Sequence, residues 1–211
     1  SRGLGDVYKR QAFILGEDFI QDDSVALILG DNIFHGENLQ QLIIQSMSLV
    51  DLGKSVVIGH KVPDPERYGV AVMDNKNQVI SIQEKPKDPK SDIAIVGLYF
   101  YTNNVVKIAQ NLTPSDRGEL EITDINNVYI EQKKMEVNIM GEGFTWLDTG
   151  TFDSLHKAST FVQLLQKSSN YRLGLIDEVA FINNFINKKQ LEKNLLNLSH
   201  DFKEYITKKY L

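Results

Sequence analysis

Two aspartates in this sequence each follow an apolar segment of the kind that forms a buried strand. Asp31 comes after Val25-Ala-Leu-Ile-Leu-Gly30, and Asp148 comes after Phe144-Thr-Trp-Leu147. Ligands of open α/β sheets bind beyond the carboxyl ends of the strands, so both acids are expected at one edge of a sheet. Two carboxylates there can hold one Mg²⁺, which takes one or two protein carboxylates and leaves positions for phosphate oxygens. Simpler roles remain open, because Asp also forms turns after strands and caps helices.

A lysine and an arginine could bind the phosphate of a substrate. Lys85 stands between Glu84 and Pro86 at the end of an expected strand, where its point charge could meet a phosphate. Arg117 is followed by Gly118 just before an expected helix, and a helix N-terminus attracts anions. Taken alone, each of these cations is more often an ordinary surface residue.

The elements that must position these residues follow from the hydrophobic pattern. The run 25–29 is apolar without alternation, which is typical of a strand buried on both faces of a parallel sheet. With a helix over 37–50 and a strand over 55–59, it predicts a βαβ unit whose strands pair in parallel. Gly53 is expected to end that helix. Further strands are expected over 70–73, 79–82, 94–101, 135–140 and 144–147, and further helices over 12–20, 103–112, 117–132, 152–165 and from 177 onward.

Composition narrows the classes of protein and partner. The 211 residues carry a net charge of −5, and this balance gives no basic surface for nucleic acid. There is no cysteine, which excludes disulfides, thiolate metal sites and cysteine nucleophiles. No apolar run approaches the roughly 20 residues of a membrane span, so a membrane is not an expected partner either. A cytoplasmic protein is the expectation that fits these features.

Several short stretches, taken together, resemble the sugar-phosphate nucleotidylyltransferases. They occur in the family's order and spacing between about Gln11 and Phe161. The similarity is greatest to the members that use glucose 1-phosphate and dTTP. The stretches that carry it are Leu29-Gly-Asp-Asn-Ile-Phe34, Asp64-Pro-Glu-Arg-Tyr-Gly-Val70, Gln83-Glu-Lys-Pro86, Val96-Gly-Leu-Tyr-Phe-Tyr101, Arg117-Gly-Glu-Leu-Glu-Ile-Thr-Asp124 and Trp146-Leu-Asp-Thr-Gly150.

The resemblance implies a fold, a reaction and a set of site residues. The fold would be α/β and Rossmann-like, of the glycosyltransferase-A type, with a mixed sheet flanked by helices and a C-terminal helical appendage. The reaction would be attack by a phosphate oxygen of α-D-glucose 1-phosphate on the α-phosphorus of dTTP, which releases pyrophosphate and gives dTDP-glucose for deoxysugar and dTDP-rhamnose synthesis. Mg²⁺ would bind Asp31 and Asp148, and Lys85 would be the catalytic contact to the sugar phosphate. The sugar-phosphate site would be lined by Tyr68, Gly69, Glu84, Lys85, Val96, Tyr99 and Arg117.

One segment of the family pattern has no counterpart in this sequence. Members of the family begin with a strand and a Gly-rich loop of the form G-G-x-G-T-R-L-x-P, which wraps the triphosphate, whereas this chain opens with the unpatterned residues 1–10. We therefore expect 1–10 to be a foreign or disordered leader and the chain to lack the first strand and the Gly-rich loop. Residues 11–166 would form a partial nucleotidyltransferase domain with the sugar-phosphate and metal half, and 167–211 a C-terminal helical segment. Turnover by such a chain is expected to be impaired.

Alternatives to this function remain open. The base-reading residues are expected in the absent segment, so a uridylyltransferase that uses UTP fits the same residues. A non-catalytic module that binds a sugar phosphate is a rival from another class. A metal-dependent glycosyltransferase would also use an acid at a strand end, but Glu84-Lys-Pro86 and Trp146-Leu-Asp148 argue against it. The resemblance further implies that a full-length chain assembles as a homo-oligomer, a tetramer.

Overall fold

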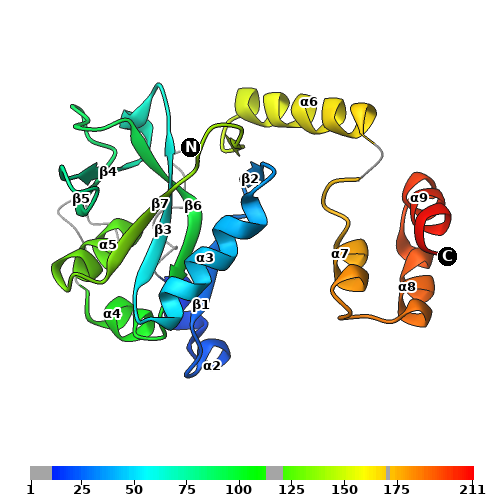
Figure 1. Ribbon diagram of the computed structural model, residues 1–211, viewed down its shortest axis with the longest axis horizontal. Helices are drawn as coiled ribbons and strands as arrows, with labels where there is room; N and C mark the ends of the chain where they lie inside the picture. Colours follow the sequence, from blue (N-terminus) through cyan, green and yellow to red (C-terminus); the bar gives the residue numbers. More distant parts are fainter. Residues whose placement is uncertain (1–10, 113–120, 170–171) are drawn as a thin grey trace. The chain divides into compact units, whose positions relative to one another are not determined.

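The chain forms two compact units, the first ending at Thr151 and the second beginning at Phe152. The computed structural model describes residues 11–112, 121–169 and 172–211, and all structural statements below refer to these residues. Every described strand belongs to the first unit, whereas the described elements of the second unit are helical (Figure 1).

The first unit is organised around a long strand, β6 (Ile93–Tyr101), in which every residue is buried. Strand β3 (Ser55–Lys61) runs antiparallel to it along one edge, and β1 (Val25–Ile28) and β4 (Gly69–Met73) pair antiparallel with its other edge. The sheet continues outward to β5 (Val79–Glu84), antiparallel to β4, and to β7 (Met135–Ile139), parallel to β3. The described strands therefore form a mixed sheet, as the family resemblance implied.

Two expectations about β1 are wrong. Its residues alternate between half-buried and exposed, with Ile28 60% exposed, so β1 is not buried on both faces. It also does not pair with β3, because β6 lies between the two strands. An apolar run predicts a strand but does not predict which strand will pair with it. The longer apolar run, that of β6, occupies the central position of the sheet.

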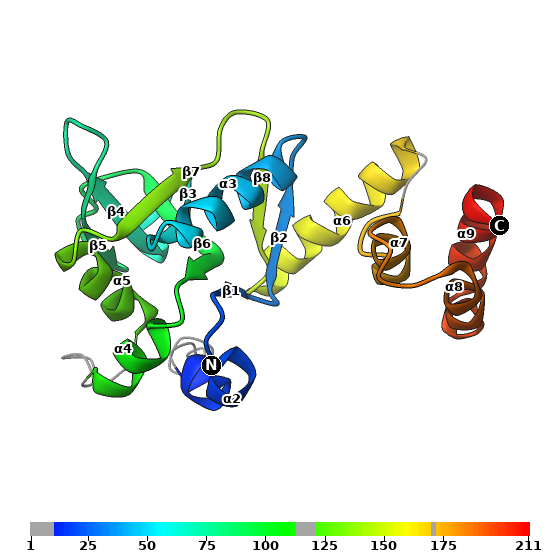
Figure 2. The same cartoon turned by 60° about the horizontal axis from the view of Figure 1, so that its bottom comes forward.

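Helices cover both faces of the sheet and create two cores. Helix α3 (Leu39–Asp51) packs on the face that carries Val96 and its neighbours, and Gly53 follows it with φ of +80° as expected for a helix end. Helices α4 (Val105–Asn111) and α5 (Ile122–Glu131) pack on the opposite face (Figure 2). Alternate residues of β6 enter opposite cores because successive side chains of a strand point to opposite faces.

A second, two-stranded sheet was not expected from the sequence. Strand β2 (Asn32–His35) runs antiparallel to β8 (Thr145–Asp148), and Asn32 stands opposite Asp148. Only β8 of this pair was predicted as a strand. Residues 32–35 lack the length and the alternation that would mark a strand, so the pairing itself determines their conformation.

The α5 helix also contacts the backbone of β5, the strand that ends the described sheet on one side. Asn127 accepts a hydrogen bond from the Ile82 N–H at 3.0 Å and donates one to the Ile82 carbonyl at 3.1 Å. One side chain therefore occupies both backbone polar groups of an outer strand residue. This contact also fixes β5 relative to α5, close to the end of the strand that carries Glu84.

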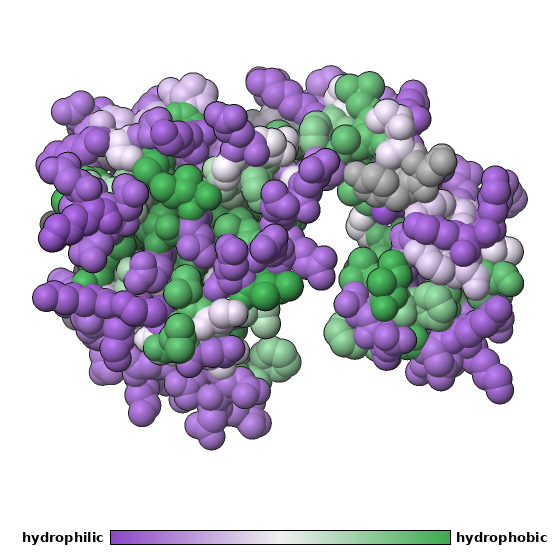
Figure 3. Space-filling model, viewed as in Figure 1, coloured by the Kyte–Doolittle hydropathy of each residue, from purple (hydrophilic) through white to green (hydrophobic). Residues whose placement is uncertain are grey.

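The second unit contains α6 (Phe152–Ser168), α7 (Ile176–Ile182), α8 (Lys188–Asn194) and α9 (His200–Tyr210), with a core of Leu175, Leu191, Leu195 and Ile206. Helix α2 (Glu17–Ile20), by contrast, lies at the start of the first unit. None of the helices within the described ranges combines the length and apolar character needed to cross a bilayer. Hydrophilic side chains cover much of the face seen in Figure 3, with hydrophobic patches between them.

A carboxylate, Glu178, ties α7 to α9 in this unit. It is 7% exposed and accepts hydrogen bonds from Tyr210 Oη at 2.6 Å, Lys209 Nζ at 2.9 Å and Tyr205 Oη at 3.0 Å. Burial alone would raise the pKa of Glu178, but the hydrogen bonds from Tyr210, Lys209 and Tyr205 outweigh it and lower that pKa. The same cluster raises the pKa of Lys209, chiefly through its hydrogen bonds to Tyr205 and Glu178.

Candidate active site

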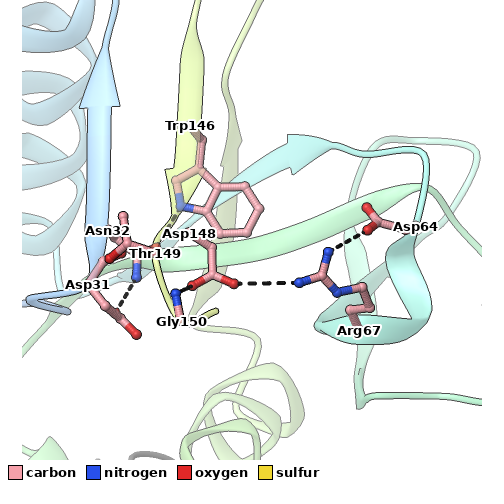
Figure 4. Close-up of polar contacts among 8 residues, drawn as sticks. All are labelled: Asp31, Asn32, Asp64, Arg67, Trp146, Asp148, Thr149 and Gly150. Carbon is pink, nitrogen blue, oxygen red and sulfur yellow. Dashed lines mark hydrogen bonds and ion pairs between the residues drawn. The ribbon is translucent and has the colours of Figure 1, made fainter. Parts of the chain in front are cut away.

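The two aspartates singled out in the sequence lie side by side. Asp31 immediately precedes Asn32, the residue that pairs with Asp148 across the β2–β8 ladder. The carbonyl of Asp31 accepts hydrogen bonds from the backbone N–H and the Oγ1 of Thr149, both at 2.8 Å. Figure 4 shows both carboxyl groups at the same end of the strand pair. The structure therefore brings the two aspartates together, but through a separate antiparallel pair and not through two strands of one parallel sheet.

The carboxylates border a cavity of about 350 Å³. It brings together most of the sequence-predicted site residues: Asp31, Asp148, Tyr68, Gly69, Glu84, Lys85 and Tyr99. These residues come from the turn before β2, the end of β8, both strands of the β4–β5 hairpin and β6. Arg67, Thr123 and Trp146 also border the cavity and were not predicted as site residues.

Lys85 and Glu84 occupy the end of β5. The Glu84 Oε2 accepts a 2.6 Å hydrogen bond from Thr123 Oγ1, and Lys85 Nζ lies 3.9 Å from Glu84 Oε1. The backbone of Lys85 has φ of +42°, which is unusual for a residue other than glycine, and its N–H donates to the Tyr68 carbonyl at 2.9 Å. A strained backbone held by its neighbours is typical of functional positions, and here it presents a cation at the cavity.

Arg67 is a cation of the site that sequence reasoning missed. Its Nη1 donates to Asp64 Oδ2 at 2.7 Å, and its Nη2 lies 3.9 Å from Asp148 Oδ2 (Figure 4). The hydrogen bond to Asp64 is the main reason that the pKa of Arg67 is raised. The guanidinium also stacks 5.2 Å from the centre of the Tyr68 ring, whose own pKa is raised mainly by burial. The spacing of Asp64 and Arg67 in the sequence could have indicated the pair, but not its approach to Asp148.

One predicted residue within the described part of the chain does not line the cavity, and a second lies outside that part. Val96 is fully buried in the core beneath α3, because it alternates with Ile95 and Gly97, which face the cavity. Arg117 lies outside the described residues. Tyr99 does border the cavity but is only 4% exposed, and its ring is stacked on Tyr101 with centroids 6.2 Å apart.

Asn32 connects three parts of this site. Its Oδ1 accepts hydrogen bonds from Trp146 Nε1 at 2.6 Å and from the Gly97 N–H at 3.2 Å, and its Nδ2 donates to Asp31 Oδ1 at 2.7 Å. A Cβ on Gly97 would lie 2.8 Å from Asn32 Cγ and from Leu29 Cβ. The space beside Gly97 is therefore filled by the protein's own Asn32 and Leu29.

The donor set of the two aspartates fits Mg²⁺. Asp148 Oδ1 accepts the Gly150 N–H at 3.0 Å and Asp31 Oδ1 accepts from Asn32, so each carboxylate is oriented through one oxygen. The other oxygen of each acid can turn towards a cation. Among the described residues, no group of three or more His, Cys, Asp or Glu side chains is arranged to hold a metal. An oxygen-only site with two carboxylates leaves most positions for water and phosphate, which is the usual form of a Mg²⁺ site.

Comparison with known proteins agrees with this geometry. Residues 9–164 match the family model described as nucleotidyl transferase, and the chain belongs to this family. It is similar to glucose-1-phosphate thymidylyltransferases: it is 47% identical over 182 residues to that of Neisseria gonorrhoeae, covering 86% of this chain and 62% of the relative. It is 41% identical over 181 residues to that of Mycobacterium tuberculosis, covering 86% and 62%. The chain thus spans less than two thirds of the length of these curated relatives.

Solved structures show the same fold. A Bacillus anthracis protein described as a glucose-1-phosphate thymidylyltransferase, solved in complex with sucrose, superimposes with a TM-score of 0.63 at 40% identity, covering 72% of this chain and 59% of that chain. Apo UDP-glucose pyrophosphorylase superimposes with a TM-score of 0.66 at 22% identity, covering 75% and 60%. At that identity the second likeness concerns the fold alone. The α/β nucleotidyltransferase fold implied by the sequence motifs is confirmed.

Proposed function

We propose that this chain carries the sugar-phosphate and metal half of an enzyme that joins dTTP and α-D-glucose 1-phosphate into dTDP-glucose and pyrophosphate. The observation that carries the proposal is the convergence of Asp31 and Asp148 on a cavity that Lys85 also borders. The relatives named glucose-1-phosphate thymidylyltransferase support the choice of substrates. A cytoplasmic location and a homo-oligomeric assembly are part of the proposal and rest on the same family.

The reaction brings two polyanions together, so its catalyst must mainly position them and neutralise charge. Asp31 and Asp148 would hold Mg²⁺, which when bound supplies Lewis-acid stabilisation of charge on the phosphate oxygens. Lys85 would bind the phosphate of glucose 1-phosphate as a point charge. Arg67, fixed by Asp64, supplies a second cation that can form paired hydrogen bonds to a phosphate.

The hexose would lie against Glu84 and Gly69. One oxygen of Glu84 is engaged by Thr123, so the carboxylate has a fixed direction and can accept hydrogen bonds from sugar hydroxyls. Gly69 stands opposite Glu84 in the β4–β5 ladder, and a Cβ there would lie 3.3 Å from Glu84 Oε2. A side chain at position 69 would therefore occupy the surface on which the sugar is proposed to rest.

Calorimetric titration of the chain with glucose 1-phosphate in the presence of Mg²⁺ tests the sugar-phosphate half. Lys85→Met should weaken binding about tenfold or more, since a hydrogen bond to a charged group contributes about 1.5–3 kcal/mol. Lys87→Met removes a nearby exposed lysine outside the cavity and is the matched control. Glucose without its phosphate should bind more weakly and should not respond to Lys85→Met. Equal affinity of wild type and Lys85→Met for glucose 1-phosphate would contradict the assignment.

Turnover distinguishes the proposed enzyme from its rivals. Release of pyrophosphate should be measured with glucose 1-phosphate and either dTTP or UTP, with and without Mg²⁺. Product from dTTP in preference to UTP supports a thymidylyltransferase, and the reverse supports a uridylyltransferase. Tight binding of glucose 1-phosphate with no product from either nucleotide, even after the family's N-terminal strand and Gly-rich loop have been joined to the chain, favours a non-catalytic binding module.

A further inference from the structure

The Asn32 side chain uses both ends of its amide at the proposed metal site. Its Oδ1 receives two N–H donors, from Trp146 at 2.6 Å and from Gly97 at 3.2 Å, while its Nδ2 faces Asp31 at 2.7 Å (Figure 4). Neither the Trp146 indole nor a backbone N–H can accept a hydrogen bond, so the oxygen of the amide must face them. The amide nitrogen is therefore held towards Asp31, and the two possible orientations are reduced to one.

This arrangement gives Asp31 its direction. The side chain of Asp31 is exposed. The hydrogen bonds that Asp31 accepts from Thr149 go to its backbone carbonyl and do not orient its carboxylate. The hydrogen bond from Asn32 engages Oδ1 and leaves Oδ2 for a cation. Partners behind a metal ligand commonly orient it in this way, and their loss typically weakens metal binding about 10- to 100-fold.

We propose that Asn32 is the positioning residue of the cation site, which holds Asp31 in its ligating orientation and connects it mechanically to Trp146. The inference rests on the proposed metal site and adds to it a residue that need not touch the cation. At its other end, Trp146 packs edge to face against Tyr68 with ring centroids 5.0 Å apart, so the connection extends to the cavity wall.

The chain carries a natural reporter for this connection. Trp146 is its only tryptophan, so one indole N–H resonance reports the hydrogen bond to Asn32. A Mg²⁺ ion bound by Asp31 would displace the Asp31 carboxylate. The hydrogen bonds of Asn32 would pass this displacement on to the Trp146 indole. We expect this resonance to shift when Mg²⁺ is added to the ¹⁵N-labelled chain, without any nucleotide or sugar present.

Asn32→Leu tests the proposal, because leucine has a similar size and cannot donate to Asp31. Asn138→Leu is the matched control: it removes a hydrogen bond of 2.9 Å to Ser46 from the same unit, away from the cavity. Electron paramagnetic resonance of free Mn²⁺ gives the cation affinity. Asn32→Leu should weaken it about tenfold or more, and Asn138→Leu should leave it within about twofold of wild type. The Trp146 resonance of Asn32→Leu should no longer respond to Mg²⁺.

The outcomes separate this inference from the proposed function. Absence of Mn²⁺ binding by the wild-type chain would overturn the metal site itself. Binding that Asp148→Asn weakens but folded Asn32→Leu retains at wild-type strength would overturn only the role of Asn32. If Asn32→Leu does not fold, the NMR spectrum of the wild-type chain provides the test. The inference is then overturned if neither the Asn32 side-chain amide signals nor the Trp146 indole signal shifts when Mg²⁺ is added.

Discussion

Replacing Gly97 by alanine should disturb the site through one added methyl group. The Cβ would lie 2.8 Å from Asn32 Cγ, Asn32 Oδ1 and Leu29 Cβ, so these atoms must move by about 0.6 Å or more to reach an ordinary contact. The backbone of Gly97 does not have positive φ, so alanine adds crowding without backbone strain. Overpacking of a filled position costs about 1–3 kcal/mol, and each kcal/mol lowers the thermal midpoint of a chain of this size by about 2–4 °C.

Differential scanning calorimetry should therefore record a fall of about 2–12 °C in the midpoint of the first unit for Gly97→Ala. Gly141→Ala is the control, because a Cβ at Gly141 meets nothing within 4 Å and that glycine also lacks positive φ. The displaced Asn32 should also move the Trp146 indole resonance of Gly97→Ala but not that of Gly141→Ala. A Gly97→Ala chain with the midpoint and the indole resonance of wild type would refute the packing argument.

Three further changes have expected outcomes. Asp148→Asn should weaken Mn²⁺ binding about tenfold or more, measured by electron paramagnetic resonance, because one of two carboxylate ligands loses its charge; unchanged affinity would remove it from the metal site. Arg67→Met should strengthen Mn²⁺ binding about two- to fivefold, because the exposed guanidinium 3.9 Å from Asp148 no longer competes with the ion for that carboxylate. An unchanged Mn²⁺ affinity would mean that solvent fully screens the charge of Arg67. Glu178→Gln should destabilise the second unit at neutral pH and flatten its pH dependence in urea unfolding, with exposed Glu192→Gln as control. The pKa of Glu178 is lowered from 4.5, so its ionised form stabilises the fold above about pH 4.5, and this contribution is lost as the pH falls through the folded pKa. Plots of unfolding free energy against pH that run parallel for Glu178→Gln and wild type would contradict this role of Glu178.

The acids and the lysine of the site were predictable because strand ends are visible in the sequence. The apolar segments before Asp31 and Asp148 and the turn at Lys85 could be recognised without a partner. The pairing that joins Asp31 to Asp148 could not, because β2 carries no strand pattern of its own and forms only against β8. Sequence reasoning therefore placed the two acids together, but by assuming the wrong sheet.

The supporting residues were missed for a related reason. The side chains of Asn32 and Arg67 contact Trp146 and Asp148, which are far away in the sequence. No local sequence pattern predicts contacts of this kind. Val96 shows the opposite error: a stretch that matches a family motif contains residues of both faces of β6, and only alternate positions can reach the cavity. The neighbours of β1 were likewise not encoded in its own apolar run.

The contact between Asn127 and Ile82 has a consequence for association between molecules. Backbone groups on an outer strand are templates to which a strand of another chain can add, and such addition begins many aggregates. At Ile82 both groups are already bonded to an amide that resembles a peptide unit. An incoming strand would have to displace α5 at this position, so the helix shields this stretch of the sheet from self-assembly.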